Sequence, residues 1–452
     1  MTKTEIRDFT EGKVTRQLIK FASPLFLANL LQIVYNMVDM VVVGAAEGAE
    51  GISAVSVGGD VVALLTFIGM GFSSAGQVLI ARFIGAGEKE KIGKFVGTMT
   101  SFFLCAVAAI TVLGLIFRHP ILRLMRTPEE AYSGALSYSV ISTVGLVFIY
   151  GYNVVAGILR GMGDSKHPFV FIFVAAGLNV LLDLLFVFGL EMGAAGAALA
   201  TVISQGTSFL SSLVFLWLRR SAFGLEVAGR DFLRPDGEML SMLVKLGVPM
   251  AIKTASIQFS KLFVNAYING CGLAISAFAG IANKISAVAN LVSQAMNAAG
   301  STMVGQNIAA GKHRRVNSIL LNLGVITLSV AALLSAVMIA FPRAVYSLFT
   351  DDPEVLSVGD GFVYIAVILF VSGALRSVAN ALINGSGSTR INFVTAILDG
   401  IVMRIGLALL FGVALGMEHY GFWLGDALAG FTPFLIGAVF YLTGLWKIKK
   451  PK

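Results

Sequence analysis

Long apolar stretches alternate with short polar ones along the whole chain. A helix that crosses a bilayer needs about 20 apolar residues, and twelve stretches of this chain are long enough. They cover residues 16–44, 52–82, 92–117, 131–158, 167–189, 193–218, 241–269, 275–308, 316–341, 355–384, 391–415 and 420–446. The pattern therefore predicts an all-α polytopic membrane protein with twelve transmembrane helices.

Composition agrees with a lipid environment. Of the 452 residues, 57% are hydrophobic and 13% are charged, whereas a soluble domain carries about 25% charged residues. The 50 glycines fit as well, because small residues let helices approach closely in lipid. No His, Cys and carboxylate cluster has metal-ligand spacing, and no catalytic constellation is visible. We therefore expect a monomer in the bilayer that is not an enzyme and holds no metal or resident cofactor.

The basic residues are distributed unevenly between alternate loops. Most of the 33 Lys and Arg residues lie in the tails and in the loops on the side of the N-terminus. The opposite loops hold only Arg118, Arg123, Arg126 and Arg343. Cytoplasmic loops carry the excess of positive charge, so we expect both termini in the cytoplasm and the chain in the cell (inner) membrane. No soluble stretch is long enough for a nucleic-acid-binding domain, so the net charge of +8 is interpreted as a topology signal.

The second half of the chain repeats the first with an offset near 224 residues. Lys20-Phe-Ala-Ser-Pro24 matches Lys245-Leu-Gly-Val-Pro249, and Leu159-Arg-Gly-Met-Gly163 matches Ile383-Asn-Gly-Ser-Gly387. We expect two pseudo-symmetric six-helix lobes, with the N-lobe at 1–218, a cytoplasmic linker at 219–240 and the C-lobe at 241–452. Six spans bring each lobe back to the side it started from, so the lobes are parallel repeats with substrate expected between them.

Polar residues in the first half converge at one depth. Counted from the segment ends, Asp39, Asp183 and Thr201 each lie roughly 8–12 Å below the outer surface. Asn179 is one helical turn from Asp183, on the same face. Two carboxylates, an amide oxygen and a hydroxyl form a hard oxygen site that suits a small cation or a shared proton. The alternative is a structural Asp that is hydrogen-bonded to a neighbouring helix.

A polar stripe leads to this site along the first segment. Gln32, Tyr35, Asn36 and Asp39 follow the helical spacing i, i+3, i+4, i+7. The first three are candidate substrate-binding residues. Tyr138 and Asn153 in segment 4 are further candidates, although an ordinary interhelical hydrogen bond is the favoured interpretation for these two.

The second half carries basic residues instead of a second acidic site. Arg376 and Asp399 lie at similar depth, so we expect them to form a structural ion pair. Lys261 and Asn265 are candidate substrate-binding residues, because surplus positive charge would attract anionic or zwitterionic groups. The alternative, that several of the charged residues here are buried salt bridges, remains open. Seven charged residues are concerned: Lys253, Lys261, Lys284, Arg376, Asp399, Arg404 and Asp426.

Three motifs together resemble the multidrug and toxic compound extrusion (MATE) family. They are Leu159-Arg-Gly-Met-Gly-Asp-Ser165 with Pro168, Gly193-Ala-Ala-Gly-Ala-Ala-Leu-Ala-Thr201, and Gln77-Val-Leu-Ile-Ala-Arg82 followed by Gly85-Ala-Gly87. The resemblance implies an antiporter that exports cationic or amphipathic drugs by alternating access, driven by Na⁺ or H⁺. It also implies a cation site made of Asp39, Asn179, Asp183, Ala197 (through its carbonyl) and Thr201. The acidic position that some members use in the seventh helix is absent, since Lys253, Lys261 and Asn265 stand there.

The leading hypothesis is therefore a secondary active multidrug antiporter with small organic substrates and H⁺ or Na⁺ as the coupling ion. A flippase for lipid-linked sugars, or an exporter of anionic or zwitterionic metabolites, is the alternative, because either would explain the basic residues of the second half. The twelve spans and the acid pair of the first half count against a flippase.

Overall fold

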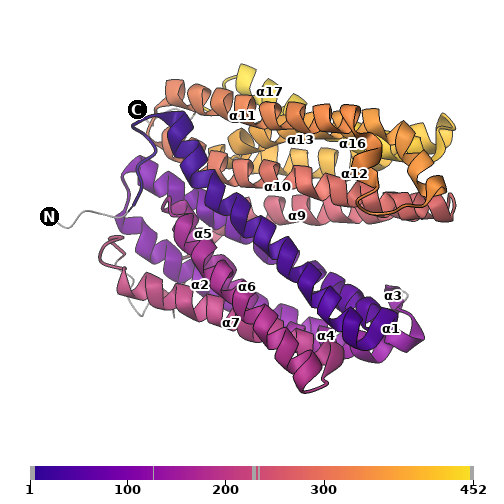
Figure 1. The fold of residues 1–452 in the computed structure, drawn as a ribbon. Helices are drawn as coiled ribbons and strands as arrows, with labels where there is room; N and C mark the ends of the chain where they lie inside the picture. Colours follow the sequence, from indigo (N-terminus) through magenta and orange to yellow (C-terminus); the bar gives the residue numbers. More distant parts are fainter. Residues whose placement is uncertain (1–5, 126, 226–230, 233–234, 448–452) are drawn as a thin grey trace. The chain divides into compact units, whose positions relative to one another are not determined.

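The computed structural model describes residues 6–125, 127–225, 231–232 and 235–447, and these are helices and their connections (Figure 1). Within these residues, ten helical stretches are long and apolar enough to cross a membrane. They are α1 (Val14–Ala86), α2 (Glu90–Ile116), α6 with the π-helix η1 (Lys166–Gly189), α7 (Gly193–Leu218), α9 (Gly237–Asn269), α10 (Leu273–Ala309), α11 (His313–Ala340), α13 (Pro353–Ser386), α14 to η3 (Thr389–Ala414) and α16 with α17 (Glu418–Leu442).

Two of the predicted segments are joined in α1. A continuous helix of 73 residues would be about 110 Å long, far more than the roughly 30 Å of a hydrocarbon core. The helix is broken at Gly48, where φ is 65° and ψ is −146°, a conformation that only glycine adopts readily. The pair α4 (Glu129–Val144) and α5 (Leu146–Gly161), bent by 48°, covers one more segment. All twelve predicted segments therefore lie on helices. The remaining short helices are α3 (Arg118–Leu124) and α12 (Pro342–Tyr346).

The chain divides into two compact units. The N-terminal unit comprises Met1–Arg7 and Ser23–Gly247, and the C-terminal unit comprises Asp8–Ala22 and Val248–Lys452. In the N-terminal unit α7 packs against α4, α5 and α6, whereas in the C-terminal unit α13 packs against α10, α11, α16 and α17. The unit boundaries fall just before Pro24 and Pro249, which occupy matching positions in the two halves. Each unit thus differs from the predicted lobe by containing the start of the other lobe's first helix.

Buried contacts fix the segment 8–22 in the C-terminal unit. Phe9 and Phe21 are buried, with their ring centroids 5.0 Å apart. The Phe9 backbone N–H donates to Oε1 of Gln306 at 2.9 Å, and Nδ2 of Asn307 donates to the Phe9 carbonyl at 3.1 Å. Arg315 donates to the backbone carbonyls of Phe9, Glu11 and Gly12 at 2.7–2.8 Å. This network closes the end of α10 and the start of α11 over the beginning of the chain.

The segment before α9 is held in the N-terminal unit in a corresponding way. The Asp236 backbone N–H donates to Oγ1 of Thr98 at 3.0 Å, and Lys94 pairs with the Asp236 carboxylate at 2.7 Å. The Lys94 ammonium holds the pKa of Asp236 below its ordinary value. Ser101 donates to the Phe232 carbonyl at 2.5 Å. Both α1 and α9 therefore begin in one unit and continue in the other.

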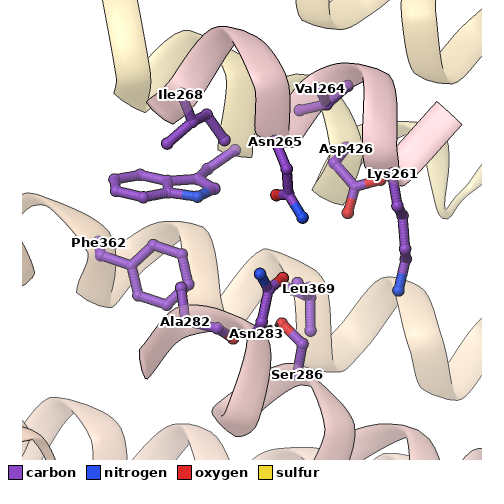
Figure 2. Close-up of a pocket in the computed structure, with 11 residues that line it drawn as sticks. Lys261, Val264, Asn265, Ile268, Ala282, Asn283, Ser286, Phe362, Leu369 and Asp426 are labelled. Atoms are coloured by element: carbon purple, nitrogen blue, oxygen red, sulfur yellow. Dashed lines mark hydrogen bonds between the residues drawn. The ribbon is translucent and has the colours of Figure 1, made fainter. Parts of the chain in front are cut away.

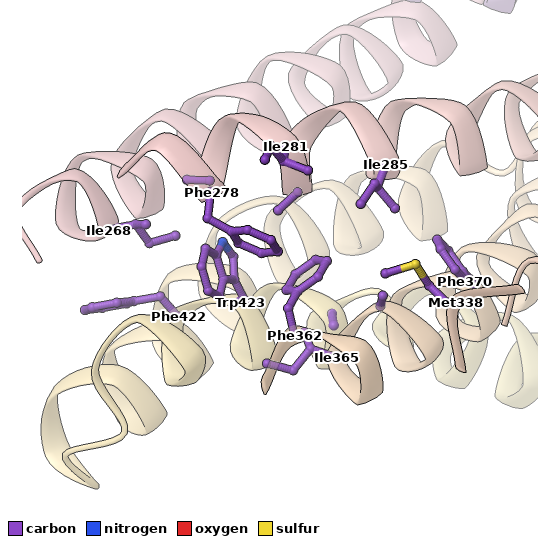
Figure 3. Packing of buried hydrophobic residues seen from close by; sticks show 14 of the residues in the cluster. Ile268, Phe278, Ile281, Ile285, Met338, Phe362, Ile365, Phe370, Phe422 and Trp423 are labelled. Carbon is purple, nitrogen blue, oxygen red and sulfur yellow. The ribbon is translucent and has the colours of Figure 1, made fainter. Parts of the chain in front are cut away.

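Aromatic side chains fill the centre of the C-terminal unit (Figure 3). Phe278 of α10 meets Tyr346, Phe362 and Trp423 edge to face, with ring centroids 5.1, 5.4 and 5.6 Å apart. Such pairs add about 0.5–1.5 kcal/mol each beyond their buried area. The N-terminal unit has a smaller cluster of Val43, Ala54, Tyr138, Ala197 and Ala198, and this cluster surrounds the buried end of the polar stripe.

Two π-helices lie at matching places in the two halves of the chain. η1 (Leu184–Gly189) and η3 (Leu410–Ala414) are each followed by a turn and then by a helix with a glycine against the π-helix backbone. A Cβ on Gly196 would lie 3.1 Å from the backbone of Phe186, and one on Gly421 would lie 2.4 Å from that of Phe411. The offset here is 225, whereas Phe169 and Phe393 are 224 apart. The C-terminal unit contains one additional π-helix between these points, η2 (Leu398–Met403). A π turn holds one residue more than an α turn, which explains the change of offset.

Candidate functional site

The structure brings together four of the residues that the sequence assigns to a cation site. Asp39 comes from α1, Asn179 and Asp183 come from α6, and Thr201 comes from α7. Asp39 and Asn179 are each 2% exposed, and Asp183 is fully buried. α6 and α7 are consecutive and pack against each other, so their contribution follows from local chain order, whereas Asp39 arrives from a distant segment.

A short hydrogen-bond chain links three of these side chains. Nδ2 of Asn179 donates to Oγ1 of Thr201 at 3.4 Å, and Oγ1 of Thr201 donates to Oδ2 of Asp39 at 3.2 Å. The Asp183 carboxyl lies close enough to Asp39 for a direct interaction between the two groups. The Thr201 hydroxyl therefore donates a hydrogen bond to Asp39 and none to Asp183.

Four buried oxygen atoms of this site find no hydrogen-bond donor among the described residues. They are Oδ1 of Asp39, Oδ1 of Asn179 and both carboxyl oxygens of Asp183. A buried acceptor without a donor is destabilising by about 1–3 kcal/mol, and more if it is charged. A small cation or a proton would satisfy these atoms, since all of them are hard oxygen ligands.

The backbone at Asp183 is unusual in a way that serves this site. Asp183 is the last residue of α6, and η1 begins with the next residue. π turns in α-helices are rare and frequently lie at functional sites. Ala197 lies one turn before Thr201 on α7, fully buried, so its position is compatible with the carbonyl ligand that the sequence implies.

The polar stripe on α1 is only partly engaged. Tyr35 is buried and accepts from Nε2 of Gln205 at 3.3 Å, whereas Gln32 and Asn36 are exposed. Gln205 was not predicted from the sequence, although its spacing of four residues from Thr201 places both on one face of α7. The stripe therefore continues from α1 to α7.

The two candidates in segment 4 differ in their surroundings. Tyr138 is buried in the cluster beside Asp39 and Thr201, and its ring packs on Gly58, where a Cβ would come within 2.5 Å. Asn153 instead donates to the carbonyl of Ile149 in its own helix at 2.8 Å. Tyr138 thus joins the site, and the Asn153 amide is occupied by its own backbone.

The prediction that Arg376 pairs with Asp399 in the C-terminal unit is wrong, because Asp399 pairs with Arg404 instead. Arg404 donates to Oδ1 of Asp399 at 3.2 Å and also forms an ion pair with Asp426. Arg376 donates to Oδ1 of Asn290 at 2.8 Å. The reason is the π-helix η2, because residues five apart stack on one face of a π turn. Asp399 and Arg404 have that spacing, which α-helical geometry does not align.

Lys253, like Arg376, donates to a side-chain amide oxygen. Lys253 is 8% exposed, and its ammonium donates to Oδ1 of Asn380. Lys253 and Arg376 thus donate to neutral oxygens, and the Asp399 carboxylate acts on both charges from beyond ion-pair distance. The interpretation of buried salt bridges therefore holds for Arg404 but not for these two residues.

A small pocket of mixed polar and apolar lining includes Asp426, the carboxylate that pairs with Arg404 (Figure 2). Lys261 and Asn265, one turn apart on α9, face Asn283 and Ser286 of α10 across it. Phe362 and Trp423 are among its apolar lining residues. Its volume is about 30 Å³, enough for about two water molecules. No ion pair or hydrogen bond engages the Lys261 ammonium within the described ranges of the chain.

The sequence is similar to a family model and to curated proteins along most of its length. The sequence model of the MatE family matches residues 24–185 and 249–418, one match in each repeat. A protein described as "Probable multidrug resistance protein YpnP" from Bacillus subtilis is 28% identical over 444 residues, which are 98% of each chain. The "Multidrug export protein MepA" of Staphylococcus aureus is 22% identical over 407 residues, covering 89% of this chain and 88% of the relative.

Solved structures share the fold. A structure described as the outward-facing conformation of a multidrug resistance MATE family transporter superposes with a TM-score of 0.90 at 22% identity, covering all of both chains. A transporter of the MOP superfamily from Pyrococcus furiosus gives a TM-score of 0.89 at 23% identity, over 99% of this chain and all of the other. That second transporter is described as having a binding pocket of reversed polarity, which suggests a different function for it.

Proposed function

Since this chain belongs to the MatE family of multi-pass membrane transporters, which are not enzymes, we propose that it is a secondary active multidrug efflux antiporter. It exports amphipathic organic compounds by alternating access in exchange for H⁺ or Na⁺. The names of the curated relatives support drug export, and the charge asymmetry of the loops supports an orientation with both termini in the cytoplasm. In a background with Cys105→Ser and Cys271→Ser, because both native thiols are free and exposed, resistance of a Lys89→Cys variant to membrane-impermeant reagents in intact cells, with labelling of Leu124→Cys, tests this orientation.

The observation that carries the proposal is the set of unsatisfied oxygens around Asp183. Two carboxyl groups that lie together in a buried site repel each other unless a cation or a proton lies between them. A ligand shifts a conformational equilibrium only through different affinities for its states. A site that must take up a cation when it is closed from water and release it when it is open can provide that difference. We assign the coupling ion to Asp39, Asn179, Asp183, Thr201 and the Ala197 carbonyl.

The substrate-binding residues of this proposal line the stripe next to the cation site. Tyr35, Gln32, Asn36 and Tyr138 present hydroxyl and amide groups beside Asp39, a combination that suits amphipathic compounds with a polar or cationic end. Asn153 supports the helix at this point, since its amide is used locally. A substrate bound to the stripe would lie next to the cation, so that each would influence the affinity for the other.

Transport in proteoliposomes tests the coupling site directly. A pH gradient and a Na⁺ gradient are imposed separately, with the wild type, Asp39→Asn and Asp183→Asn, and with Glu50→Gln as the control, because Glu50 is an exposed carboxylate on the same helix. Both site variants should lose at least roughly ten-fold in gradient-driven export, the effect of about 1.4 kcal/mol, whereas the control should not. Wild-type gradient dependence in both site variants would move the coupling site elsewhere.

One observation favours a second candidate function, the export of anionic or zwitterionic compounds. The pocket at Lys261 and Asn265 offers an ammonium and two amides, and the one carboxylate among its lining residues, Asp426, is paired with Arg404. Lys261→Ala, with the exposed Lys284→Ala as control, should weaken transport of zwitterionic compounds several-fold if this pocket binds them. An unchanged substrate range would leave cationic and neutral amphiphiles as the substrates. A flippase for lipid-linked sugars is tested in the same vesicles with a pyrophosphate-linked lipid.

A further inference from the structure

A basic groove lies at the point where α1 and α11 begin, within the C-terminal unit. Its polar lining comes from Lys13, Thr15 and Arg16 on the chain start and from Arg315, Ser318 and Asn322 on α11. Oγ1 of Thr15 donates to Oδ1 of Asn322 at 2.5 Å, so the two walls are tied together across the groove. No Asp or Glu is among the described residues that line it.

No carboxylate of the described residues forms an ion pair with Lys13, Arg16 or Arg315, although the Asp8 and Glu11 carboxylates act on Arg315 at longer range. Arg315 donates hydrogen bonds to three backbone carbonyls and to Oε1 of Gln17. All four acceptors are neutral. Lys13 and Arg16 are exposed and take part in no ion pair within the described ranges. The nearby Glu11 lies 3.7 Å from Lys312 and does not line the groove. Three fixed cations therefore face one concavity.

Two helix starts add to this potential. α1 begins at Val14 and α11 begins at His313, and residues of the first turn of each line the groove. Helix starts carry partial positive charge and free N–H groups. Together with two hydroxyl groups and an amide, the three cations offer the recognition chemistry of a phosphate diester.

The groove continues directly into an apolar surface. Ile19, three residues after Arg16, is 51% exposed. Leu321 and Val325, three and seven residues after Ser318 on the same face of α11, are 69% and 58% exposed. Both helices are long and apolar enough to span a bilayer. A bilayer around them would place the groove at their starts level with the lipid headgroups and the apolar residues level with the acyl chains.

We propose that this groove is a binding site for an anionic phospholipid. Its phosphate lies between Lys13, Arg16 and Arg315, and its acyl chains run along Ile19, Leu321 and Val325. The bound lipid would hold the segment 8–22 against α11 and so reinforce the contacts that close the C-terminal unit. Basic pockets between helices at the membrane surface are typical sites for acidic lipid headgroups. This site is separate from the residues assigned to ion and drug transport.

Native mass spectrometry of the full-length protein with defined lipids tests the site. Phosphatidylglycerol should be retained more tightly than phosphatidylcholine of the same chain length. Lys13→Gln/Arg16→Gln should reduce its affinity roughly 10- to 30-fold, the effect of two cations near a lipid headgroup. Both side chains are exposed, and Arg315 is left in place, so the variant keeps the contacts that hold the segment. Lys89→Gln/Lys245→Gln is the matched control, because it removes two exposed cations that do not line the groove.

Binding of soluble phosphate compounds distinguishes a lipid-binding site from a site for a free anion. Glycerophosphoglycerol and inorganic phosphate should bind at least roughly ten-fold more weakly than phosphatidylglycerol, since neither contacts the apolar surface. Equal binding of inorganic phosphate would overturn the assignment in favour of a free-anion site. Equal retention of phosphatidylcholine, or equal losses in the groove variant and the control variant, would also overturn it.

Discussion

The two units place different chemistry at equivalent positions of one fold. With the offset of 225 that holds at the π-helix hairpin, Asn179 corresponds to Arg404 and Thr201 corresponds to Asp426. In the N-terminal unit these positions form a weak hydrogen bond of 3.4 Å beside two carboxyl groups. In the C-terminal unit they form an ion pair, with Asp399 as a second carboxylate on the same guanidinium.

At these equivalent positions the C-terminal unit has a cationic side chain, Arg404, whereas the N-terminal unit has the neutral side chain of Asn179. Arg404 is 2% exposed and lies between its two carboxylates. The guanidinium is permanent, because Arg stays charged in proteins. The N-terminal unit has an amide at the equivalent position, and among the described residues its carboxyl oxygens at Asp183 find no donor. In the C-terminal unit the fixed cation is part of the structure, and we propose that the corresponding hairpin of the N-terminal unit binds an exchangeable one.

The largest expected effect comes from removing the built-in cation. Arg404→Met should destabilise the protein by about 3–5 kcal/mol, because it leaves the buried Asp399 and the half-buried Asp426 without their partner. Thermal unfolding in detergent measures this. Arg343→Met is the control, since it breaks an exposed ion pair with Asp360 at 3.1 Å. A loss no greater than that of the control would mean that the Arg404 pairs are not structural.

The same chemical change in both units should then give opposite results. Asp399→Asn removes a partner of the buried Arg404 and should lower the folded yield and the free energy of unfolding by about 1–3 kcal/mol. Asp183→Asn removes a carboxyl that no described residue satisfies, so stability should stay the same or rise. Unfolding curves of the two variants, recorded side by side, check this. Equal destabilisation would remove the contrast between the units.

The contacts of the chain start should have an intermediate effect. Arg315→Gln removes a side chain that donates four hydrogen bonds to residues 9–17, and we expect a loss of about 2 kcal/mol. Arg314→Gln, at an exposed neighbouring position, is the control. Hydrogen exchange of residues 8–22 should rise in the first variant only. Unchanged protection there would show that the segment is held without Arg315, by its buried aromatic rings and the bonds of Gln306 and Asn307 to the Phe9 backbone.

The smallest effect is expected at the corresponding contact in the N-terminal unit, and it depends on pH. The pKa of Asp236 is held below its ordinary value of 3.8 by the Lys94 ammonium. Its stabilising contribution is therefore fully present above about pH 4, and it is lost as the pH falls through the lower folded-state pKa. Asp236→Asn keeps the acceptor for the Met239 N–H but carries no charge. The gap in melting temperature between wild type and variant should shrink below about pH 4, and a constant gap would contradict the pair.

The sequence predicts the helices well because bilayer thickness dictates their length. All twelve apolar segments lie on helices of the structure, and depth counting places Asp39 and Thr201 together because α1 and α7 rise uniformly. The same counting fails for Asp399, since the π-helix η2 shifts the register by one residue. The repeat motif at 20–24 and 245–249 marks where each unit begins. No local pattern shows that residues 8–22 pack on α10 and α11, because those contacts join residues almost 300 positions apart.

The exchange of helix starts constrains how the protein is made. Residues 8–22 emerge from the ribosome first, yet the Phe9 backbone bonds to a side chain 297 residues later. At 5–20 residues per second, roughly 15–60 s pass before that partner is synthesised. During this time Phe9, Leu18 and Phe21, which are buried in the finished fold, have no partner of their own unit. In a ribosome-bound chain, residues 8–22 therefore remain without their packing partners until the last third of the chain is translated. A C-terminal half expressed from Val248 onward lacks residues 8–22, which are part of its own core.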